Sequence, residues 1–136
     1  MVDGYADQFA DVDVAQVLDA LRLMRRASLL IRELEAYFAR HDISQLRFLT
    51  MILIDREPER DCLAASEIAE RLDVSRPVVT RTLQGLEKAG LVKISENADD
   101  ARSRNVTLTP EGKGKLDEVL PGYFAILHRP DPGGEK

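Results

Sequence analysis

The stretch that decides the fold is Ala64–Thr109, AASEIAERLDVSRPVVTRTLQGLEKAGLVKISENADDARSRNVTLT. Apolar residues recur there at helical spacing in two short segments, which begin at Ser66 and after Ser75. This spacing predicts two helices joined by a tight turn. Alternating residues then predict two strands, Leu91–Ser95 and Asn105–Thr109. The stretch therefore predicts a helix-turn-helix followed by a β-hairpin.

Local signals fix the ends of the second helix. Ser75 is a good N-cap, and Pro77 falls in the first turn, where a missing N–H group is tolerated. Gly90 suits the left-handed residue that follows a helix end. Three apolar side chains share one face of this helix, and we expect that face to be buried: Val79, Leu83 and Leu86.

The opposite face of the same helix is polar and carries no acidic residue before Glu87. A single α-helix fits the major groove of DNA, where Arg, Gln and Thr read base edges or hold phosphates. Any amphipathic surface helix has a polar face, but charged surface helices usually mix signs, and this one lacks carboxylates. The face therefore favours DNA contact, through Arg76, Pro77, Thr80, Arg81, Gln84 and Lys88.

The hairpin loop Glu96–Arg104 gives a second, independent indication. Arg102 and Arg104 are two residues apart, so they project from the same side of an extended segment. Asp100 is placed to hold the Arg102 guanidinium by a charge-assisted hydrogen bond. An arginine at a hairpin tip suits a narrow minor groove. A solvated loop with a local ion pair, worth about 0–1 kcal/mol, is the alternative, but beside the acid-free helix we favour DNA.

These residues resemble the MarR family of winged helix-turn-helix regulators. The resemblance is carried by SEIAERL at 66–72, SRPVVTRTLQGLEKAGLV at 75–92 and the wing motif DARSRNVTLTPEG at 100–112, and it covers about residues 14–120. It implies a dimer whose second helix-turn-helix helices enter successive major grooves, roughly 34 Å apart, while the wing arginines reach the flanking minor grooves.

The resemblance also implies which residues meet DNA, with Arg102 at the wing tip. The candidates are Ser66, Ser75, Arg76, Pro77, Thr80, Arg81, Gln84, Lys88, Asp100, Arg102 and Arg104. We expect a dimeric repressor of a pseudo-palindromic operator on double-stranded DNA. Family members commonly bind a small effector between the long first helix and the DNA-binding lobe, so relief by an unidentified small ligand is part of the expectation.

Val14–Arg40 predicts one long helix with two apolar stripes. Two interpretations fit these stripes equally: a central core helix, or a helix with one stripe on its own core and the other on a second subunit. The first stripe is Val17, Leu21, Met24, Ser28 and Ile31, and the second is Leu23, Ala27, Leu30, Leu34 and Tyr37.

The C-terminal part departs from the family pattern, which usually continues with long helices that braid with the partner. Thr109-Pro110-Glu111 begins a helix that we expect to end near Leu120, because Pro121-Gly122 interrupts it. We therefore expect the dimer to use Val14–Arg40 together with four apolar residues of the segment that follows: Tyr123, Phe124, Ile126 and Leu127.

The whole chain of 136 residues, 44% of them hydrophobic, predicts one domain. Its fold class is mainly α with a small β-hairpin (α+β): a winged helix-turn-helix lobe plus a long N-terminal dimerisation helix. The expected parts are an acidic arm at 1–12, N-terminal helices at 14–55 (the second capped by Ser44), the winged helix-turn-helix at 62–109, a C-terminal helical segment at 110–127 and a disordered tail at 128–136. Within them, Cys62–Ala64 forms a short strand.

Composition bounds the class of protein. Apolar runs fall short of the ~20 residues that span a bilayer, and a basic-then-apolar leader is missing. With a single cysteine, Cys62, we expect a cytoplasmic protein with no membrane association. The net charge of −5 lowers the expectation of nonspecific DNA binding. It does not exclude a specific site, because binding follows the local potential at the contact face.

Catalysis has little support. His41 and His128 are the two histidines, and no metal-ligand spacing is present. Gly112-Lys-Gly-Lys lacks the spacing and the Ser/Thr of a phosphate loop. We therefore expect no enzyme activity, no metal and no cofactor. Cys62 is better explained as a buried, inert thiol than as a redox sensor. The competing function is a winged-helix module that pairs with another regulator without reading DNA itself.

Overall fold

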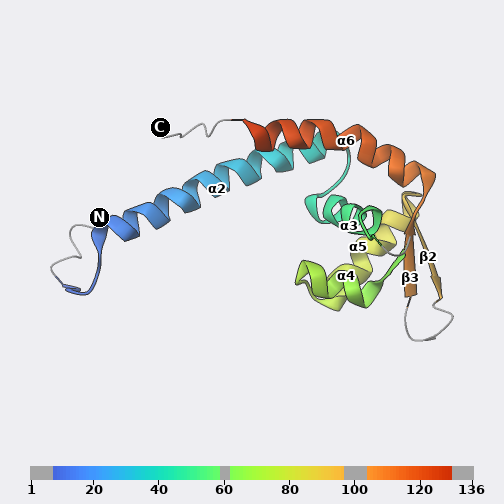
Figure 1. The fold of residues 1–136 in the computed structure, drawn as a ribbon, viewed down its shortest axis with the longest axis horizontal. Helices are drawn as coiled ribbons and strands as arrows, with labels where there is room; N and C mark the ends of the chain where they lie inside the picture. Colours follow the sequence, from blue (N-terminus) through green and yellow to red (C-terminus); the bar gives the residue numbers. More distant parts are fainter. Residues whose placement is uncertain (1–7, 59–61, 97–103, 130–136) are drawn as a thin grey trace.

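Helices form most of the structure, a computed structural model that describes residues 8–58, 62–96 and 104–129. A long helix extends from a small lobe made of short helices and a sheet (Figure 1). The expected class, mainly α with a small antiparallel sheet, is confirmed. The elements are α2 (Val14–Arg40), α3 (Gln45–Asp55), β1 (Cys62–Ala64), α4 (Ala65–Leu72), α5 (Arg76–Lys88), β2 (Val92–Glu96), β3 (Arg104–Leu108) and α6 (Pro110–His128).

The sheet has three strands in the order β1-β3-β2, all antiparallel, so the expected hairpin gains β1 as a third strand. Both hairpin strands lie one residue from the predicted positions. The reason is Thr109, whose hydroxyl donates to the Gly90 carbonyl at 2.7 Å and accepts the Gly112 N–H at 2.9 Å. Thr109 therefore caps α6 instead of ending β3, and the pairing runs on to Glu96 and Arg104.

The helix-turn-helix follows the capping signals closely. Ser75 accepts the Val78 N–H at 3.4 Å, and Asp73 has the left-handed φ of 55° that ends α4. Gly90, with φ +79°, follows the C-cap of α5. Helix α4, the first helix of the helix-turn-helix, starts at Ala65 and not at the predicted Ser66. The Glu67 carboxylate explains the difference, because it accepts the Ala64 N–H at 2.9 Å and so makes Ala64 the N-cap.

The prediction that Pro121-Gly122 interrupts the C-terminal helix is wrong, because α6 continues through both residues to His128. Gly122 has a packing role there. A Cβ at this position would lie nearer than 3.0 Å to the ring and hydroxyl of Tyr37. The missing side chain lets buried Tyr37 lie on the α6 backbone, where its hydroxyl donates to the Val119 carbonyl at 2.7 Å. The packing of Tyr37 against α6 therefore stabilises a helix that continues through Pro121.

The structure of α2 excludes one of the two forms that its stripes suggested and leaves packing on a second subunit as a prediction. Leu34, Tyr37 and Phe38 near its C-terminal end are buried against α3 and α6, so this end of α2 packs on the chain's own core. Residues 19–32 are exposed on every side, which excludes a central core helix. The apolar side chains left uncovered by the chain itself are Leu21, Leu23, Met24, Leu29, Leu30 and Ile31.

The remaining expectations divide between confirmation and correction. Ser44 caps α3 as predicted, accepting the Arg47 N–H at 3.2 Å. Of the apolar residues expected to serve a dimer, Tyr123 and Ile126 pack on the chain's own core, while Phe124 and Leu127 are exposed.

Cys62 is half-buried, whereas the sequence predicted a buried thiol. In the predicted tail, His128 is helical and Arg129 pairs with Glu33, whereas 130–136 and residues 1–7 of the acidic arm lie outside the described residues.

Candidate nucleic-acid interface

Helix α5 presents the predicted polar face to solvent. Its apolar side is closed, with Val79 and Leu83 each 3% exposed and Leu86 fully buried. Packing on that side against α3, α4 and β2 fixes the rotation of the helix. Every predicted α5 residue, together with its N-cap, is exposed on the other side: Ser75, Arg76, Pro77, Thr80, Arg81, Gln84 and Lys88.

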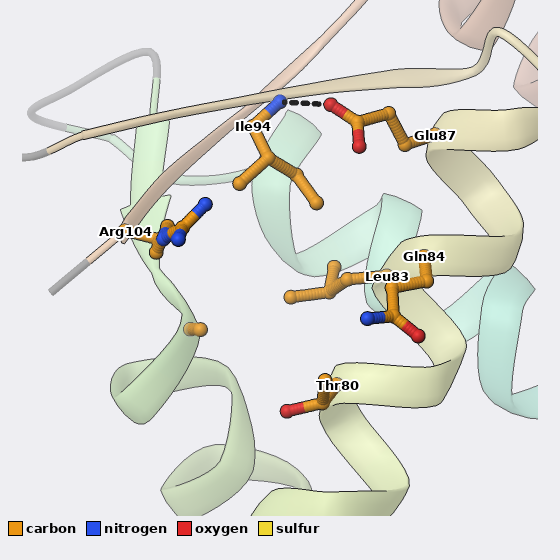
Figure 2. A pocket seen from close by; sticks show the side chains of 7 residues that line it. Thr80, Leu83, Gln84, Glu87, Ile94 and Arg104 are labelled. Atoms are coloured by element: carbon orange, nitrogen blue, oxygen red, sulfur yellow. Dashed lines mark hydrogen bonds between the residues drawn. The ribbon is translucent and has the colours of Figure 1, made fainter.

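The acidic residue within α5, Glu87, is turned toward the sheet. Its Oε2 accepts the backbone N–H of Ile94 in β2 at 3.2 Å. The carboxylate therefore ties the helix to the hairpin (Figure 2). The exposed face of α5 keeps its positive character, and the angle between helix and hairpin is held by a side-chain contact. The sequence predicted the acid-free face but gave no sign of this link.

A cleft of about 340 Å³ separates α5 from the sheet. Figure 2 shows Arg104, at the start of β3, on one wall and Thr80 and Gln84 of α5 on the other. Ser66 is exposed in the first turn of α4, next to Ala65 of the cleft lining. The structure thus brings Arg104 beside the exposed face of α5, and the full lining of the cleft is Ala65, Thr80, Leu83, Gln84, Glu87, Ile94 and Arg104. Asp100 and Arg102 lie outside the described residues.

The other flank of α5 meets Arg47 from the first turn of α3. A Cβ on Gly85 would lie nearer than 3.0 Å to two atoms of the Arg47 guanidinium. The group therefore rests directly against the α5 backbone, and Arg47 stays half-buried. Sequence reasoning missed this residue. The available signal was the glycine itself, since an isolated glycine inside a helix usually has a packing reason.

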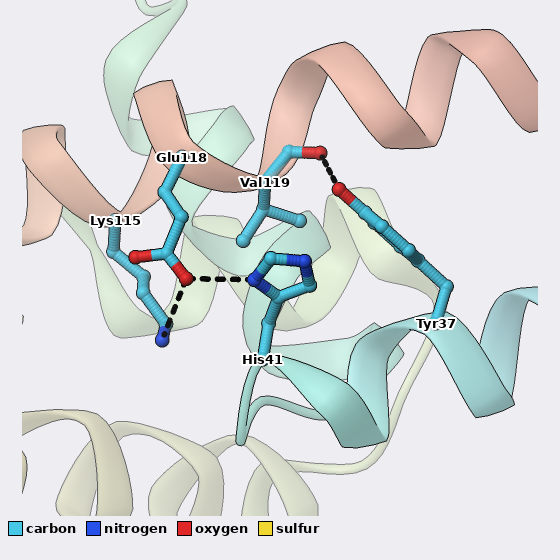
Figure 3. Close-up of polar contacts among 5 residues, drawn as sticks. All are labelled: Tyr37, His41, Lys115, Glu118 and Val119. Atoms are coloured by element: carbon cyan, nitrogen blue, oxygen red, sulfur yellow. Dashed lines mark hydrogen bonds and ion pairs between the residues drawn. The ribbon is translucent and has the colours of Figure 1, made fainter.

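A polar cluster joins α2 to α6 at the base of the long helix (Figure 3). His41, the C-cap of α2, contacts Glu118 through Nδ1 at 2.6 Å, and Lys115 lies 3.6 Å from the same carboxylate oxygen. The hydrogen bond with His41, followed by the positive charge of Lys115, holds the pKa of Glu118 below its ordinary value of 4.5. The His41 ring also packs 4.7 Å from that of Tyr37. This cluster was not predicted either.

Within residues 8–58, 62–96 and 104–129, no group of three or more His, Cys, Asp or Glu side chains lies close enough together to hold a metal ion. No helix in the same ranges combines the length and apolar character that a bilayer crossing requires.

Comparison with known proteins gives one consistent result. A model of the MarR family matches residues 41–103. The transcriptional repressor YetL of Bacillus subtilis is 31% identical over 127 residues, which cover 93% of this chain and 75% of YetL.

Solved structures agree in fold. AbsC, a MarR family transcriptional regulator from Streptomyces coelicolor, superposes with a TM-score of 0.78 at 22% identity, over 87% of this chain and 78% of AbsC. The regulator MOSR of Mycobacterium tuberculosis, solved in complex with DNA, gives a TM-score of 0.65 at 25% identity, over 79% of this chain and 76% of MOSR.

Proposed function

This chain belongs to the MarR family of transcriptional regulators, and from that premise we propose that it is a sequence-specific DNA-binding repressor. The observation that carries the proposal is the exposed, acid-free face of α5 with Arg104 beside it across the cleft. YetL, which is 31% identical over 93% of this chain, is named a transcriptional repressor. Its name supports repression, as opposed to activation, as the proposed activity.

In the proposed mode of binding, α5 enters the major groove. Gln84 and Arg81 are exposed side chains of the type that pair with adenine and guanine edges, and each good bidentate pair gives about 1–3 kcal/mol of discrimination. Arg76 and Lys88, at the two ends of α5, face the phosphates. The wing, with Arg104 at its base and Arg102 in its loop, reaches the neighbouring minor groove.

We also propose that a second copy of this chain completes the operator-binding unit. One α5 helix makes few base contacts, and two-fold related helices double them on a pseudo-palindrome. The apolar residues left exposed on α2, with Phe124 and Leu127 of α6, supply the self-complementary surface. Met24→Glu, at a residue 65% exposed, should leave the protomer folded and lower the mass found by sedimentation. A wild type that is monomeric at DNA-binding concentrations contradicts the dimer.

Relief by a small ligand is part of the proposal. We place this ligand in the cleft between α5 and β3, and not between α2 and the lobe as the family resemblance implies, because there it would cover Thr80, Gln84 and Arg104, which are proposed to meet DNA. Such a ligand would therefore compete with the operator directly. We propose that the protein acts in the cytoplasm, because a transcriptional regulator works where the chromosome lies.

Retardation of a duplex from the region upstream of its own gene tests the proposal. The wild type should retard this duplex at moderate salt, and Arg102→Ala should weaken the binding. The matched control is Arg56→Ala at the exposed C-cap of α3, outside both the proposed DNA contacts and the proposed dimer surface, which should bind as the wild type does. A wild type that retards no fragment, while forming a stable complex with another protein, would favour the protein-interaction module.

A further inference from the structure

We infer that Arg47 is an additional DNA-phosphate contact, delivered from α3 to the flank of α5; this inference rests on the proposed function. The first observation is position. Gly85 lies one helical turn from both Arg81 and Lys88, so the three residues share a stripe along α5. Because the Arg47 guanidinium rests on Gly85, it fills the gap in that stripe with a positive charge.

The second observation is the glycine. A glycine in a helix interior lowers stability by about 1 kcal/mol relative to alanine. Gly85 is half-buried in α5, and its missing side chain leaves the space that the guanidinium occupies. A Cβ at this position would require the guanidinium to shift.

The third observation is the state of the guanidinium. Across the described residues, no carboxylate forms an ion pair with Arg47, although Arg22, Arg71 and Arg129 each have one. A guanidinium carries its donors in a rigid fork that suits a phosphate. Held against a helix and left without an anion, Arg47 is prepared for a phosphate on the wall of the groove that α5 enters.

The two flanks of α5 then have matching roles. Arg104 borders the helix on the side of the wing, and Arg47 borders it on the side of α3. The base-reading residues lie between these two cations. Arg47 binds the backbone and carries no sequence information, so it should strengthen binding to every duplex alike.

The test is the salt dependence of binding to a duplex that the wild type retards, measured by fluorescence anisotropy for wild type, Arg47→Gln and Arg47→Lys. Losing one phosphate contact lowers the slope of log K against log salt by about 0.9. The advantage of the wild type over Arg47→Gln should therefore shrink about 3.5-fold between 50 and 200 mM salt. Arg47→Lys should keep the wild-type slope.

Two further variants separate charge from structure. Arg56→Gln, at the opposite end of α3, removes the same charge and should leave the slope unchanged. Gly85→Ala should displace the guanidinium and lower the slope while the protein stays folded in a urea titration. Equal slopes for Arg47→Gln and wild type, with or without a loss of stability, overturn the inference and leave the proposed function standing. A wild type that binds no duplex overturns the proposed function itself.

Discussion

Replacing Gly122 with alanine tests how the long helix is attached to the lobe, because two effects of opposite sign compete. On helix propensity alone, alanine in place of glycine stabilises α6 by about 1 kcal/mol. In the structure, however, the new Cβ would lie nearer than 3.0 Å to the hydroxyl, Cζ and Cε1 of Tyr37. The ring is 8% exposed and packs against Phe38 and His41, so it cannot turn aside freely.

The packing term is the larger one. Forcing an extra carbon into a filled site typically lowers stability by about 1–3 kcal/mol. Displacing Tyr37 also breaks its hydrogen bond to the Val119 carbonyl, which is worth about 1 kcal/mol. We therefore expect Gly122→Ala to destabilise the protein by a net of about 1–3 kcal/mol.

The assay is urea unfolding followed by circular dichroism, at one protomer concentration because self-association shifts the midpoint. Gly114→Ala is the matched control on the same helix, since a Cβ there meets no atom within 4 Å. That variant should be stabilised by up to about 1 kcal/mol. If both variants gain stability equally, Tyr37 does not lie on the α6 backbone as described, and the packing account of Pro121-Gly122 fails.

Two other predictions follow from single contacts. The folded-state pKa of Glu118 lies below 4.5, so its ionised carboxylate stabilises the fold above that value, and the contribution is lost as the pH falls through the folded pKa. Glu118→Gln should therefore lower the urea midpoint at about pH 6, and its midpoint should equal that of the wild type once Glu118 is protonated. A difference in midpoint that stays constant across this range would show that the charge of Glu118 does not stabilise the fold. Ser75→Ala removes the N-cap of α5 and should lower stability by about 1 kcal/mol, whereas an unchanged urea midpoint would mean that the Ser75 cap contributes nothing.

Much of the fold could be predicted because its signals are local. Ser44, Ser75 and Thr109 cap the helices they were expected to cap, since an N-cap depends on a side chain and the backbone three residues away. The amphipathic pattern of α5 likewise predicted which face is buried and which is exposed. The helical spacing of its apolar residues is enough to predict which face of α5 turns toward the core.

The failures came from contacts between distant segments. Pro121-Gly122 is a breaker by local rules, yet Tyr37, more than eighty residues earlier, packs on Gly122 and holds the helix together. The contacts of Glu87 with β2 and of His41 with Glu118 were missed for the same reason, because each joins two elements that only the tertiary fold brings together. The contact of Arg47 with α5 was missed for this reason too, because it depends on how α3 packs against α5 and not on the neighbours of Arg47 in the chain.

Selection of bound sequences from a pool of random duplexes tests the central claim most directly. If two copies of the acid-free face of α5 read DNA, the bound fraction should converge on a two-fold symmetric consensus. Its half-sites should be centred about one helical turn, roughly 10 base pairs, apart. A pool that shows no enriched sequence after repeated rounds would contradict the claim that this chain is a sequence-specific reader of DNA.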